Sequence, residues 1–557
     1  MHDLSPYPTG MVRVADYLVE RISAHGVDTV FGVPGDFVLK LFQHLDEGPL
    51  AVVNTADEQG AGFAADAYAR LRGLGVVCIT WGVGGLKIAN TTAQAFAEES
   101  PVIVISGAPS LEEQGAHMPL HHSINGYDTQ LRIFEHITVA SAVLDDPETA
   151  CREIDRVINA ALVHKQPVYL EIPRDMTLAE CPRPTSQPAG RPHSDAPALY
   201  AAVDDALGML KGAQRPVAMI GMEVARLGLL NEALDLIDRT DLPTAVMPLD
   251  KSAIPETHPR FIGVYAGQMS RPEVVDFVET ADCVLMLGSL LSDTNMGGGS
   301  GYIAPERTIH VERNSVRIGY RTYERVRLED FLAELLRREL PTYHHVAIPA
   351  RPEEQAWIPE PETKISVKRL FARLASFLTE DMVVIADPGD AMFGSLDLPM
   401  KRDHAFISNT YYASLGFAVP ASIGVQMADP DRRPVVLVGD GAFQMTGMEL
   451  ATSLRYGLTP IVVLLNNEGY TTERLMIDGD FNDVLPWHYT KLVDLFGAGQ
   501  AFLVETEGEL DRALVDAAAS NTLCIIEVRL DKMDASSALL RLTEKFGAAA
   551  GKQMLVN

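Results

Sequence analysis

The strongest chemical signal in the sequence is a carboxylate that directly follows a buried β-branched run. The run ends at Gly439, Asp440 follows it, and the next apolar run along the chain ends at Asn467. Backbone N–H groups after such a strand and at the start of the next helix attract phosphate. Asp440 would repel that phosphate unless a divalent cation lay between them, and Mg²⁺ prefers carboxylate, amide and phosphate oxygens. The pattern therefore predicts a magnesium site with Asp440 and Asn467 as ligands, with two ordinary turns as the alternative.

A second group of residues has types that suit proton transfer. His121 and His122 form a doublet of imidazoles that titrate near neutral pH, although a surface loop is the plainer interpretation. Asp36 directly precedes a predicted helix over 37–45, where an isolated aspartate is best interpreted as an N-cap. Glu58 has small neighbours, which indicate close packing rather than a solvated helix face: Ala56, Gly60, Ala61 and Ala64.

A third pattern in the same region is a pair of histidines. His117 lies four residues before His121, the spacing of a metal-binding pair on a helix. Pro119 lies between them, and proline interrupts a regular helix. We therefore do not predict a zinc site from this spacing.

The elements that must position these residues are short apolar runs introduced by proline. They begin at Pro101, Pro167, Pro216, Pro434 and Pro460. Continuous apolar runs of this length indicate strands that are buried on both faces. Helix-period stretches lie between such runs, at 152–163, 200–211, 367–378 and 446–455. The alternation predicts an α/β fold built from doubly wound parallel sheets.

Two proline-rich segments interrupt this alternation, at 181–192 and 340–363. Proline at this density disfavours helix and central strand, and it is typical of connectors between domains. We therefore predict three domains, over residues 1–181, 195–340 and 362–557.

The composition excludes several classes of protein. The 557 residues contain 75 Asp and Glu against 46 Lys and Arg, a net charge of −29. Such an exterior repels phosphate backbones and anionic lipids, so neither nucleic acid nor a membrane is an expected partner. Five cysteines without a CxxC pair fit a reducing compartment, and neither a signal-peptide pattern nor an apolar run of membrane-span length is present. We therefore expect a cytoplasmic protein.

Five motifs together resemble the 2-oxo acid decarboxylase branch of the thiamine diphosphate enzymes, which includes pyruvate, indolepyruvate and phenylpyruvate decarboxylases. The motifs are residues 31–37 (FGVPGDF), Glu58 with 64–70 (AADAYAR), the doublet at 121–122, residues 439–441 (GDG) with 466–467 (NN), and residues 469–473 (GYTTE). The motifs follow the family's order, and the resemblance covers all three predicted domains. The resemblance implies three doubly wound domains of the thiamine diphosphate-binding fold type: pyrimidine-binding, middle and diphosphate-binding.

The resemblance also implies the cofactors thiamine diphosphate and Mg²⁺, bound between subunits of a homodimer or homotetramer. The metal ligands would be Asp440, Asn467 and the carbonyl of Gly469. The pyrimidine amino group would donate to the carbonyl of Ala413, and Leu415 would support the bent form of the cofactor. Backbone groups that would hold the diphosphate are those of Gly389, Asp390, Gly441 and Ala442.

The same resemblance implies catalytic roles for the proton-transfer group. Glu58 would hydrogen-bond the pyrimidine ring, and Glu473 would lie at the reacting carbon. Asp36, His121 and His122 would complete the acid–base set. This set favours a decarboxylase over an acetolactate synthase-like carboligase, because a carboligase must avoid protonating its carbanion. A catalytically inert paralogue is a third hypothesis, and the intact acid–base positions argue against it.

The size of the substrate is predicted from three positions. Thr294, Met392 and Thr472 stand where pyruvate-specialised relatives carry larger side chains, so they leave room for a larger substrate. We therefore expect an aryl 2-oxo acid such as indolepyruvate or phenylpyruvate, with pyruvate and branched-chain 2-oxo acids as alternatives. Pro388 and Asp390 stand where many relatives have threonine or serine, which leaves the polarity of the pocket open there.

Overall fold

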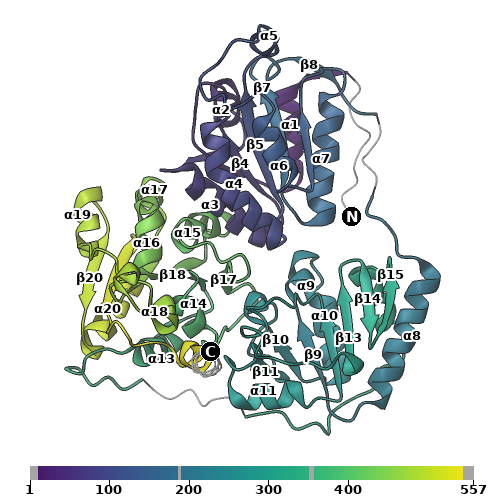
Figure 1. The fold of residues 1–557 in the computed structure, drawn as a ribbon, viewed down its shortest axis with the longest axis vertical. Helices are drawn as coiled ribbons and strands as arrows, with labels where there is room; N and C mark the ends of the chain where they lie inside the picture. Colours follow the sequence, from purple (N-terminus) through teal and green to yellow (C-terminus); the bar gives the residue numbers. More distant parts are fainter. Residues whose placement is uncertain (1–9, 186–189, 351–356, 544–557) are drawn as a thin grey trace, which may run out of the picture. The chain divides into compact units, whose positions relative to one another are not determined.

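The computed structural model describes residues 10–185, 190–350 and 357–543. Within these residues the strands form three large sheets, of six, seven and six strands, and one antiparallel pair. That pair joins β1 (Met11–Arg13) to β8 (Glu180–Pro182), so part of the first proline-rich connector is a strand. Figure 1 shows the three sheets in purple to blue, in teal and in green to yellow, each with helices around it. The predicted α/β fold of doubly wound sheets is confirmed.

The first sheet is entirely parallel and has the strand order β3-β2-β4-β5-β7-β6. The order reverses between β2 and β4, because the chain first winds toward β3 and then in the other direction. The carboxyl ends of two such strands form the crevice in which doubly wound proteins bind ligands. The strands are β2 (Thr29–Gly32), β3 (Ala51–Asn54), β4 (Gly75–Ile79), β5 (Val102–Ala108), β6 (Ala140–Val143) and β7 (Val168–Pro173).

The middle sheet has the order β11-β10-β9-β12-β13-β14-β15 and reverses between β9 and β12. Its last two strands are antiparallel, which the purely parallel prediction missed. Tight turns join β13, β14 and β15, and such short connections permit only antiparallel pairing. The strands are β9 (Pro216–Ile220), β10 (Thr244–Val246), β11 (Phe261–Val264), β12 (Cys283–Leu287), β13 (Thr308–Glu312), β14 (Ser315–Ile318) and β15 (Arg321–Glu324).

The third sheet is parallel again, with the order β17-β16-β18-β19-β21-β20 and a reversal between β16 and β18. The predicted magnesium motif lies at the end of β18, on one side of this reversal. The strands are β16 (Met382–Ala386), β17 (Phe406–Ser408), β18 (Arg433–Gly439), β19 (Ile461–Asn466), β20 (Gln500–Val504) and β21 (Cys524–Arg529).

The helices connect successive strands and cover the sheets. Around the first sheet they are α1 (Val14–Ala24), α2 (Leu39–Asp46), α3 (Glu58–Arg72), α4 (Val83–Ala97), α5 (Leu111–Gly115), α6 (Thr129–Glu135) and α7 (Ala150–His164). The middle region has α8 (Ala196–Gly212), α9 (Met222–Arg226), α10 (Leu230–Thr240), α11 (Pro272–Glu279) and α12 (Leu328–Leu336). The remaining helices are α13 (Val367–Phe377), α14 (Asp390–Ser395), α15 (Ala418–Ala428), α16 (Asp440–Thr446), α17 (Leu450–Arg455), α18 (Thr471–Met476), α19 (Leu492–Phe496) and α20 (Glu507–Ala519).

The predicted helices differ from the structure in their bounds, and one of these differences lies beside the predicted metal motif. The prediction over 446–455 corresponds to α17 alone, because α16 begins at Asp440 directly after β18 and ends at Thr446. A 3-10 turn over Gly447–Glu449 separates the two helices, and glycine is a poor former of helix interior. The metal motif therefore stands at a strand-to-helix junction without an intervening loop.

The chain divides into two compact units. One contains residues 1–191, 419–432 and 446–458, and the other contains 192–418, 433–445 and 459–557. In the second unit, one continuous core joins the middle and third sheets. The three predicted domain boundaries stay a prediction, and parts of both predicted connectors, at 186–189 and 351–356, lie outside the described residues.

The C-terminal segment is helical over 537–543, and its last residues, 544–557, are not described. Ala535, Leu539 and Leu542 are buried against Ala266 and Met269, with Phe393 of α14 and Leu475 of α18 packed around them. The segment therefore lies between the middle region and two short helices of the third sheet.

Candidate active site

In the first compact unit, three predicted site residues lie around the turn from β4 to α4. A Cβ atom on Gly35, next to Asp36, would lie 2.5 Å from Cβ of Thr80. A Cβ atom on Gly84 would lie 3.4 Å from Oε1 of Glu58, and one on Gly82 would lie 2.8 Å from Cβ of His122. Glycine is required where backbone approaches other groups so closely. The turn thus gathers the Asp36 loop, Glu58 and His122 at the reversal point of the sheet.

Asp36 and the histidine doublet form one cluster. His121 Nε2 lies 2.8 Å from Oδ2 of Asp36 in a hydrogen bond, and its ring stacks on Phe37 at 4.9 Å between centroids. The two imidazoles meet edge to face at 4.6 Å. The N-cap of α2 is Val38, without a side-chain cap, so Asp36 does not serve as that N-cap. The structure thus excludes the N-cap interpretation and brings the three residues together, and their role in proton transfer stays a prediction.

Glu58 is the first residue of α3 and is buried, with 8% of its surface exposed. The helix starts there because Asp57 caps it by accepting from the N–H of Gln59 at 2.8 Å. Lys87 of α4 forms an ion pair with Glu58 at 2.9 Å and contacts Asp57 as well. Hydrogen bonds to both carboxylates raise the pKa of Lys87. A solvated helix-face carboxylate is therefore the wrong interpretation of Glu58.

In the second unit, Asp440 and Asn467 lie at the carboxyl ends of neighbouring strands, as predicted. Asp440 is fully buried, and its carboxylate accepts from the N–H groups of Gly441 at 2.7 Å and Gly469 at 3.1 Å. Burial raises the pKa of Asp440 to about 6. Oδ1 of Asn467 is buried without a hydrogen-bond partner. A buried carboxylate and an unpartnered amide oxygen at the ends of neighbouring strands form an oxygen donor set that fits a hard divalent cation.

The backbone of the loop after β19 depends on glycine at position 469 and on hydrogen bonds from Arg474. Gly469 has φ 146°, and a Cβ atom there would lie 2.0 Å from the carbonyl of Asn482. Arg474, which is buried, donates to the carbonyls of Asn467 at 2.8 Å and Glu468 at 2.5 Å. Gly441 lies under the ring of Tyr470, and Ala442 is buried in the first turn of α16.

Gly389 and Asp390 lie across the reversal point, after β16. Gly389 has φ 108°, and the nearest atom to a Cβ there would be Oγ1 of Thr472, at 3.8 Å. The structure therefore brings Thr472 next to the predicted diphosphate loop. The carboxylate of Asp390 accepts from the N–H of Ser536 at 2.9 Å, so its side chain anchors the C-terminal segment. Its backbone, which is the predicted ligand, is not involved in that bond.

Ala413 and Leu415 lie on a loop that is fixed by a buried carboxylate. Asp387 accepts from the N–H groups of Gly416 at 2.9 Å and Ala418 at 2.8 Å. Ala413 has φ 57°, a left-handed conformation that is uncommon for alanine and marks functional loops. Leu415 is half-buried. The Asp387 carboxylate thus sets the position of both predicted cofactor contacts.

The remaining predicted residues are less closely grouped. Glu473 is exposed on α18, one turn after the metal loop. Met392 is buried in α14, with 2% of its surface exposed, and belongs to the core of the second unit. Thr294 is half-buried in the loop after β12, where its N–H donates to Asp293 at 2.8 Å. The hydrogen bonds of Thr294 stay within its own loop and do not connect it to α14 or α18.

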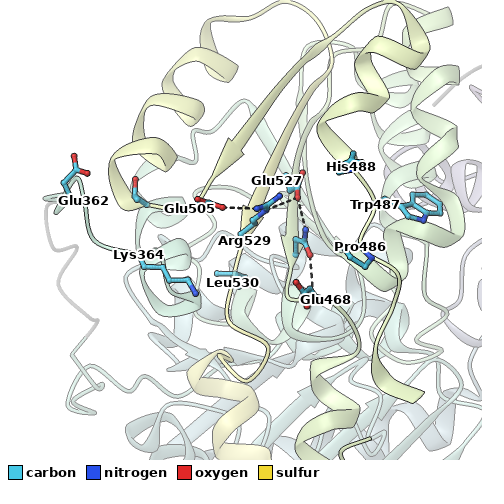
Figure 2. Close-up of a pocket in the computed structure, with 12 residues that line it drawn as sticks. Glu362, Lys364, Glu468, Pro486, Trp487, His488, Glu505, Glu527, Arg529 and Leu530 are labelled. Atoms are coloured by element: carbon cyan, nitrogen blue, oxygen red, sulfur yellow. Dashed lines mark hydrogen bonds and ion pairs between the residues drawn. The ribbon is translucent and has the colours of Figure 1, made fainter. Parts of the chain in front are cut away.

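A charged cavity of about 680 Å³ lies at the carboxyl ends of β19, β20 and β21 (Figure 2). Arg529 bridges two of the glutamates in its wall, Glu505 at 3.0 Å and Glu527 at 3.6 Å. Asn466 and Glu468, on either side of Asn467, also line it, whereas Thr294, Met392 and Thr472 do not. The cavity is therefore next to the metal loop and distinct from the predicted substrate pocket.

Three positioning residues escaped prediction from the sequence. Lys87 holds the Glu58 carboxylate, Asp387 holds the loop of Leu415, and Arg474 holds the metal loop. Arg474 directly follows the recognised GYTTE motif, and Asp387 stands at a strand end beside Gly389, so both had a local signal. Lys87 had no such local signal in the sequence, because its partner Glu58 lies on another helix.

The two halves offer different chemistry. The cluster at Asp36 joins a carboxylate to two imidazoles and can pass protons. The oxygen groups of Asp440 and Asn467 are of the type that can hold a hard cation and, through it, a phosphate. Neither half contains an electron sink of its own, so carbanion chemistry here requires a bound organic cofactor.

Comparison with known protein families gives matches along most of the chain. The family described as thiamine pyrophosphate enzyme, N-terminal TPP binding domain, matches residues 12–131. The central domain of the same enzymes matches residues 203–338, and their C-terminal TPP binding domain matches residues 389–528. Thiamine pyrophosphate is the same compound as thiamine diphosphate.

Individual relatives align over nearly their whole length. Pyruvate decarboxylase 4 of Arabidopsis thaliana is 35% identical, over 96% of this chain and 92% of its own length. The alpha-keto-acid decarboxylase of Mycolicibacterium paratuberculosis is also 35% identical, over 95% and 96%. The indole-3-pyruvate decarboxylase of Azospirillum brasilense is 35% identical, over 96% and 98%. Among the described residues, none of the helices has the length and apolar character needed to span a membrane.

Proposed function

The chain belongs to the thiamine diphosphate-dependent 2-oxo acid decarboxylases, and from this premise we propose that it converts an aryl 2-oxo acid to an aldehyde and CO₂ with the help of Mg²⁺. Pyruvate or a branched-chain 2-oxo acid is the alternative substrate. When bound, thiamine diphosphate supplies the sink for the electron pair that CO₂ leaves behind. The protein's own residues bind, orient and move protons.

The unpartnered amide oxygen of Asn467 is the observation that carries the metal part of the proposal. A buried polar atom without a partner is costly, and Asp440, at the end of the neighbouring strand β18, is a buried carboxylate. A divalent cation would satisfy both groups, with the carbonyl of Gly469 as a third ligand. Its charge would also allow the diphosphate to approach Asp440, with backbone at Gly389 and Gly441 as further contacts.

Acid–base roles follow from the other half. Glu58 is buried and held by Lys87, so it can present a fixed carboxylate to the pyrimidine ring. His121, hydrogen-bonded to Asp36, can hold a proton at its ring and pass it on, and His122 lies beside it. Glu473 is proposed to act at the reacting carbon. These groups suit protonation of a product, as a decarboxylase needs.

An aryl substrate is supported by the residues near the diphosphate loop. Thr472, beside Gly389, is smaller than the isoleucine of pyruvate-specialised relatives, and Met392 of α14 is flexible where those relatives have aromatic side chains. An indole-3-pyruvate decarboxylase is among the relatives, and so are pyruvate decarboxylases.

We also propose a homodimer or homotetramer with active sites at subunit interfaces, as in the family. A cytoplasmic location is part of the same proposal. It is supported by the five cysteines, which are all free and buried, as is common in a reducing compartment.

The test is turnover of a substrate panel by purified protein with thiamine diphosphate and Mg²⁺. CO₂ release and aldehyde formation should be highest, as kcat/KM, for phenylpyruvate or indolepyruvate. The matched variant Glu58→Gln keeps size and should lose about 10² to 10⁴ in rate while it still binds cofactor. Preference for pyruvate would overturn the aryl assignment, and full activity of the variant would overturn the role of Glu58.

A further inference from the structure

The cluster of Asp36, His121 and His122 offers a chemistry beyond proton transfer. One possible ligand atom from each of the three side chains lies within 4.8 Å of the other two. Asp36 and His121 are already in hydrogen-bond contact at 2.8 Å. The side chains of Asp36 and His121 are 44% and 59% exposed, so an ion from solution can reach them.

His122 supplies the second, independent observation. Its Nδ1 atom is buried and has no hydrogen-bond partner, and an unpartnered buried nitrogen is costly in a native structure. The residue also has φ 69°, a left-handed conformation that is uncommon outside glycine and clusters at ligand sites. The backbone of His122 lies against Gly82, where a Cβ atom would be 2.6 Å from its carbonyl oxygen. The backbone and Cβ of His122 are thus held in place by the fold.

The surrounding rings fix the other imidazole. His121 stacks on Phe37 at 4.9 Å, and Phe37 itself is buried against Trp81 at 5.9 Å. These contacts place one face of the His121 ring against a buried aromatic pair. Ligand atoms around a tetrahedral zinc ion lie about 3.4 Å apart, from metal–ligand distances of about 2.0 to 2.2 Å. Small side-chain rotations would bring the three groups from their present separation to that distance.

Two imidazoles and one carboxylate select a different ion from the all-oxygen loop at Asp440. Imidazole suits zinc, cobalt, nickel and copper, whereas Mg²⁺ prefers oxygen ligands. We propose that Asp36, His121 and His122 form a second metal site, which binds a borderline divalent ion such as Zn²⁺ or Co²⁺. The ion takes the place of the proton that His121 and Asp36 share, and that proton goes to solvent. Three protein ligands leave at least one position for water.

The consequence for turnover rests on the proposed function. A metal ion on both imidazoles withdraws them from proton transfer, so occupation of the site inhibits the decarboxylase. The Mg²⁺ loop in the other unit keeps its own ion, because its ligands are oxygens. Inhibition is therefore expected without loss of thiamine diphosphate.

The experiment is a titration of tag-free full-length protein that is saturated with Mg²⁺ and thiamine diphosphate. Zn²⁺ binding is measured by calorimetry, and Co²⁺ binding by the visible absorption of the protein-bound ion. One equivalent per chain should bind, and CO₂ release should fall in proportion to occupancy. Bound thiamine diphosphate, measured after gel filtration, should not change.

Substitutions in the cluster test which residues bind the Zn²⁺ ion. Asp36→Asn and His122→Gln keep size and should each raise the Kd of Zn²⁺ at least about tenfold, the effect of disturbing a metal site. His117→Gln is the matched control, because His117 is an exposed histidine of the same loop outside the cluster. It should bind Zn²⁺ as the unaltered protein does. Thermal melting identifies any variant that fails to fold. If one cluster variant fails to fold, the Kd of Zn²⁺ for the other cluster variant tests the site.

Other results of the Zn²⁺ titration would contradict the proposal in whole or in part. Absence of a stoichiometric Zn²⁺ site in the unaltered protein overturns the proposal, and so does a Kd that neither cluster variant changes. Stoichiometric binding that leaves CO₂ release unchanged would keep the metal site and contradict the catalytic role proposed for the cluster. Loss of thiamine diphosphate upon Zn²⁺ addition would place the ion at the Asp440 loop and overturn the proposal.

Discussion

The third sheet and the middle sheet are wound in the same way, yet they differ at the point where the strand order reverses. In the middle sheet, a Cβ atom on Gly221 after β9 would lie 2.0 Å from the carbonyl oxygen of Gly288 after β12. In the third sheet, a Cβ atom on Gly439, the last residue of β18, would meet nothing within 4 Å, and the one on Gly389 would meet only Thr472, at 3.8 Å. The same topology therefore leaves space in one sheet and closes it in the other.

Polar groups lie at both points. In the middle sheet, Oδ1 of Asp250 accepts from the N–H of Met222 at 2.8 Å at the start of α9, whereas its Oδ2 is buried without a partner. In the third sheet, the amide oxygen of Asn467 is also buried without a partner. A doubly wound sheet makes a crevice possible, and the separation of the loops is what distinguishes the third sheet from the middle sheet.

We call the reversal point of the third sheet the open point. The largest expected effect comes from removing the carboxylate of Asp440 there. Asp440→Ala should lower the affinity for thiamine diphosphate with Mg²⁺ by more than about 100-fold, because a lost ligand costs more than the 10 to 100-fold of a lost outer contact. Calorimetric titration with thiamine diphosphate and Mg²⁺ measures this affinity. Asp250→Ala, the matched change in the middle sheet, should lower the melting temperature and leave that affinity unchanged. Near-equal cofactor affinity in both variants would contradict the comparison.

A second test adds one methyl group at each point. Gly221→Ala forces the backbone of Gly288 to move and should lower the free energy of unfolding by about 1 to 3 kcal/mol, as overpacking does. Gly439→Ala meets open space and should change that free energy by less than about 0.5 kcal/mol. Urea unfolding followed by circular dichroism gives both values. Equal stability of the two variants would show that the middle point is not closed.

The open point could be predicted from the sequence because its residues are local to strand ends. Asp440 and Asn467 each follow a continuous apolar run, and parallel strands place such ends on one edge. The parallel sheets of the fold followed from the same runs. The antiparallel β14 and β15 did not, because a run such as Ser315–Ile318 has no feature that sets its direction.

Contacts between residues on different helices or segments could not be predicted from local sequence patterns. Lys87 meets Glu58 through the packing of α4 on α3, and Asp390 meets Ser536 across the sequence distance between α14 and the C-terminal segment. Asp36 alone favoured the N-cap interpretation, and only the structure, with Val38 as the N-cap of α2 and His121 hydrogen-bonded to Asp36, excluded it. Such contacts depend on tertiary packing, which local patterns do not encode.

A third prediction tests whether side chains near the open point set substrate size. Thr472→Ile should lower kcat/KM for phenylpyruvate by about 10 to 200-fold relative to pyruvate, the usual cost of excluding small groups. Thr472 is half-buried beside Gly389, so the change fits without a large cost to packing. The kinetics of both substrates give the ratio.

The double variant Thr294→Tyr with Met392→Trp extends this test. Met392 is 2% exposed, so the larger ring carries a packing cost of about 1 to 3 kcal/mol, and thermal melting must precede the kinetics. Aryl substrates should lose more kcat/KM than pyruvate does. Equal losses for both substrates in a well-folded variant would remove these positions from the pocket.

The smallest expected effect is a dependence of stability on pH that arises at the open point. Burial raises the pKa of Asp387 to about 7, well above the value of about 3.9 in an unfolded chain. A group whose pKa is raised on folding contributes stability below its unfolded value, and that contribution is lost as pH rises through 7. Asp387→Asn cannot ionise, so its melting temperature should fall less than that of the unaltered protein between pH 5 and about 8. The variant should be less stable overall, because an amide cannot accept from both Gly416 and Ala418 as the carboxyl group does. The exposed Asp431→Asn is the control and should keep the unaltered slope. An unchanged slope in Asp387→Asn would mean that this carboxylate is already charged at low pH, held there by the N–H groups of the loop that carries Leu415.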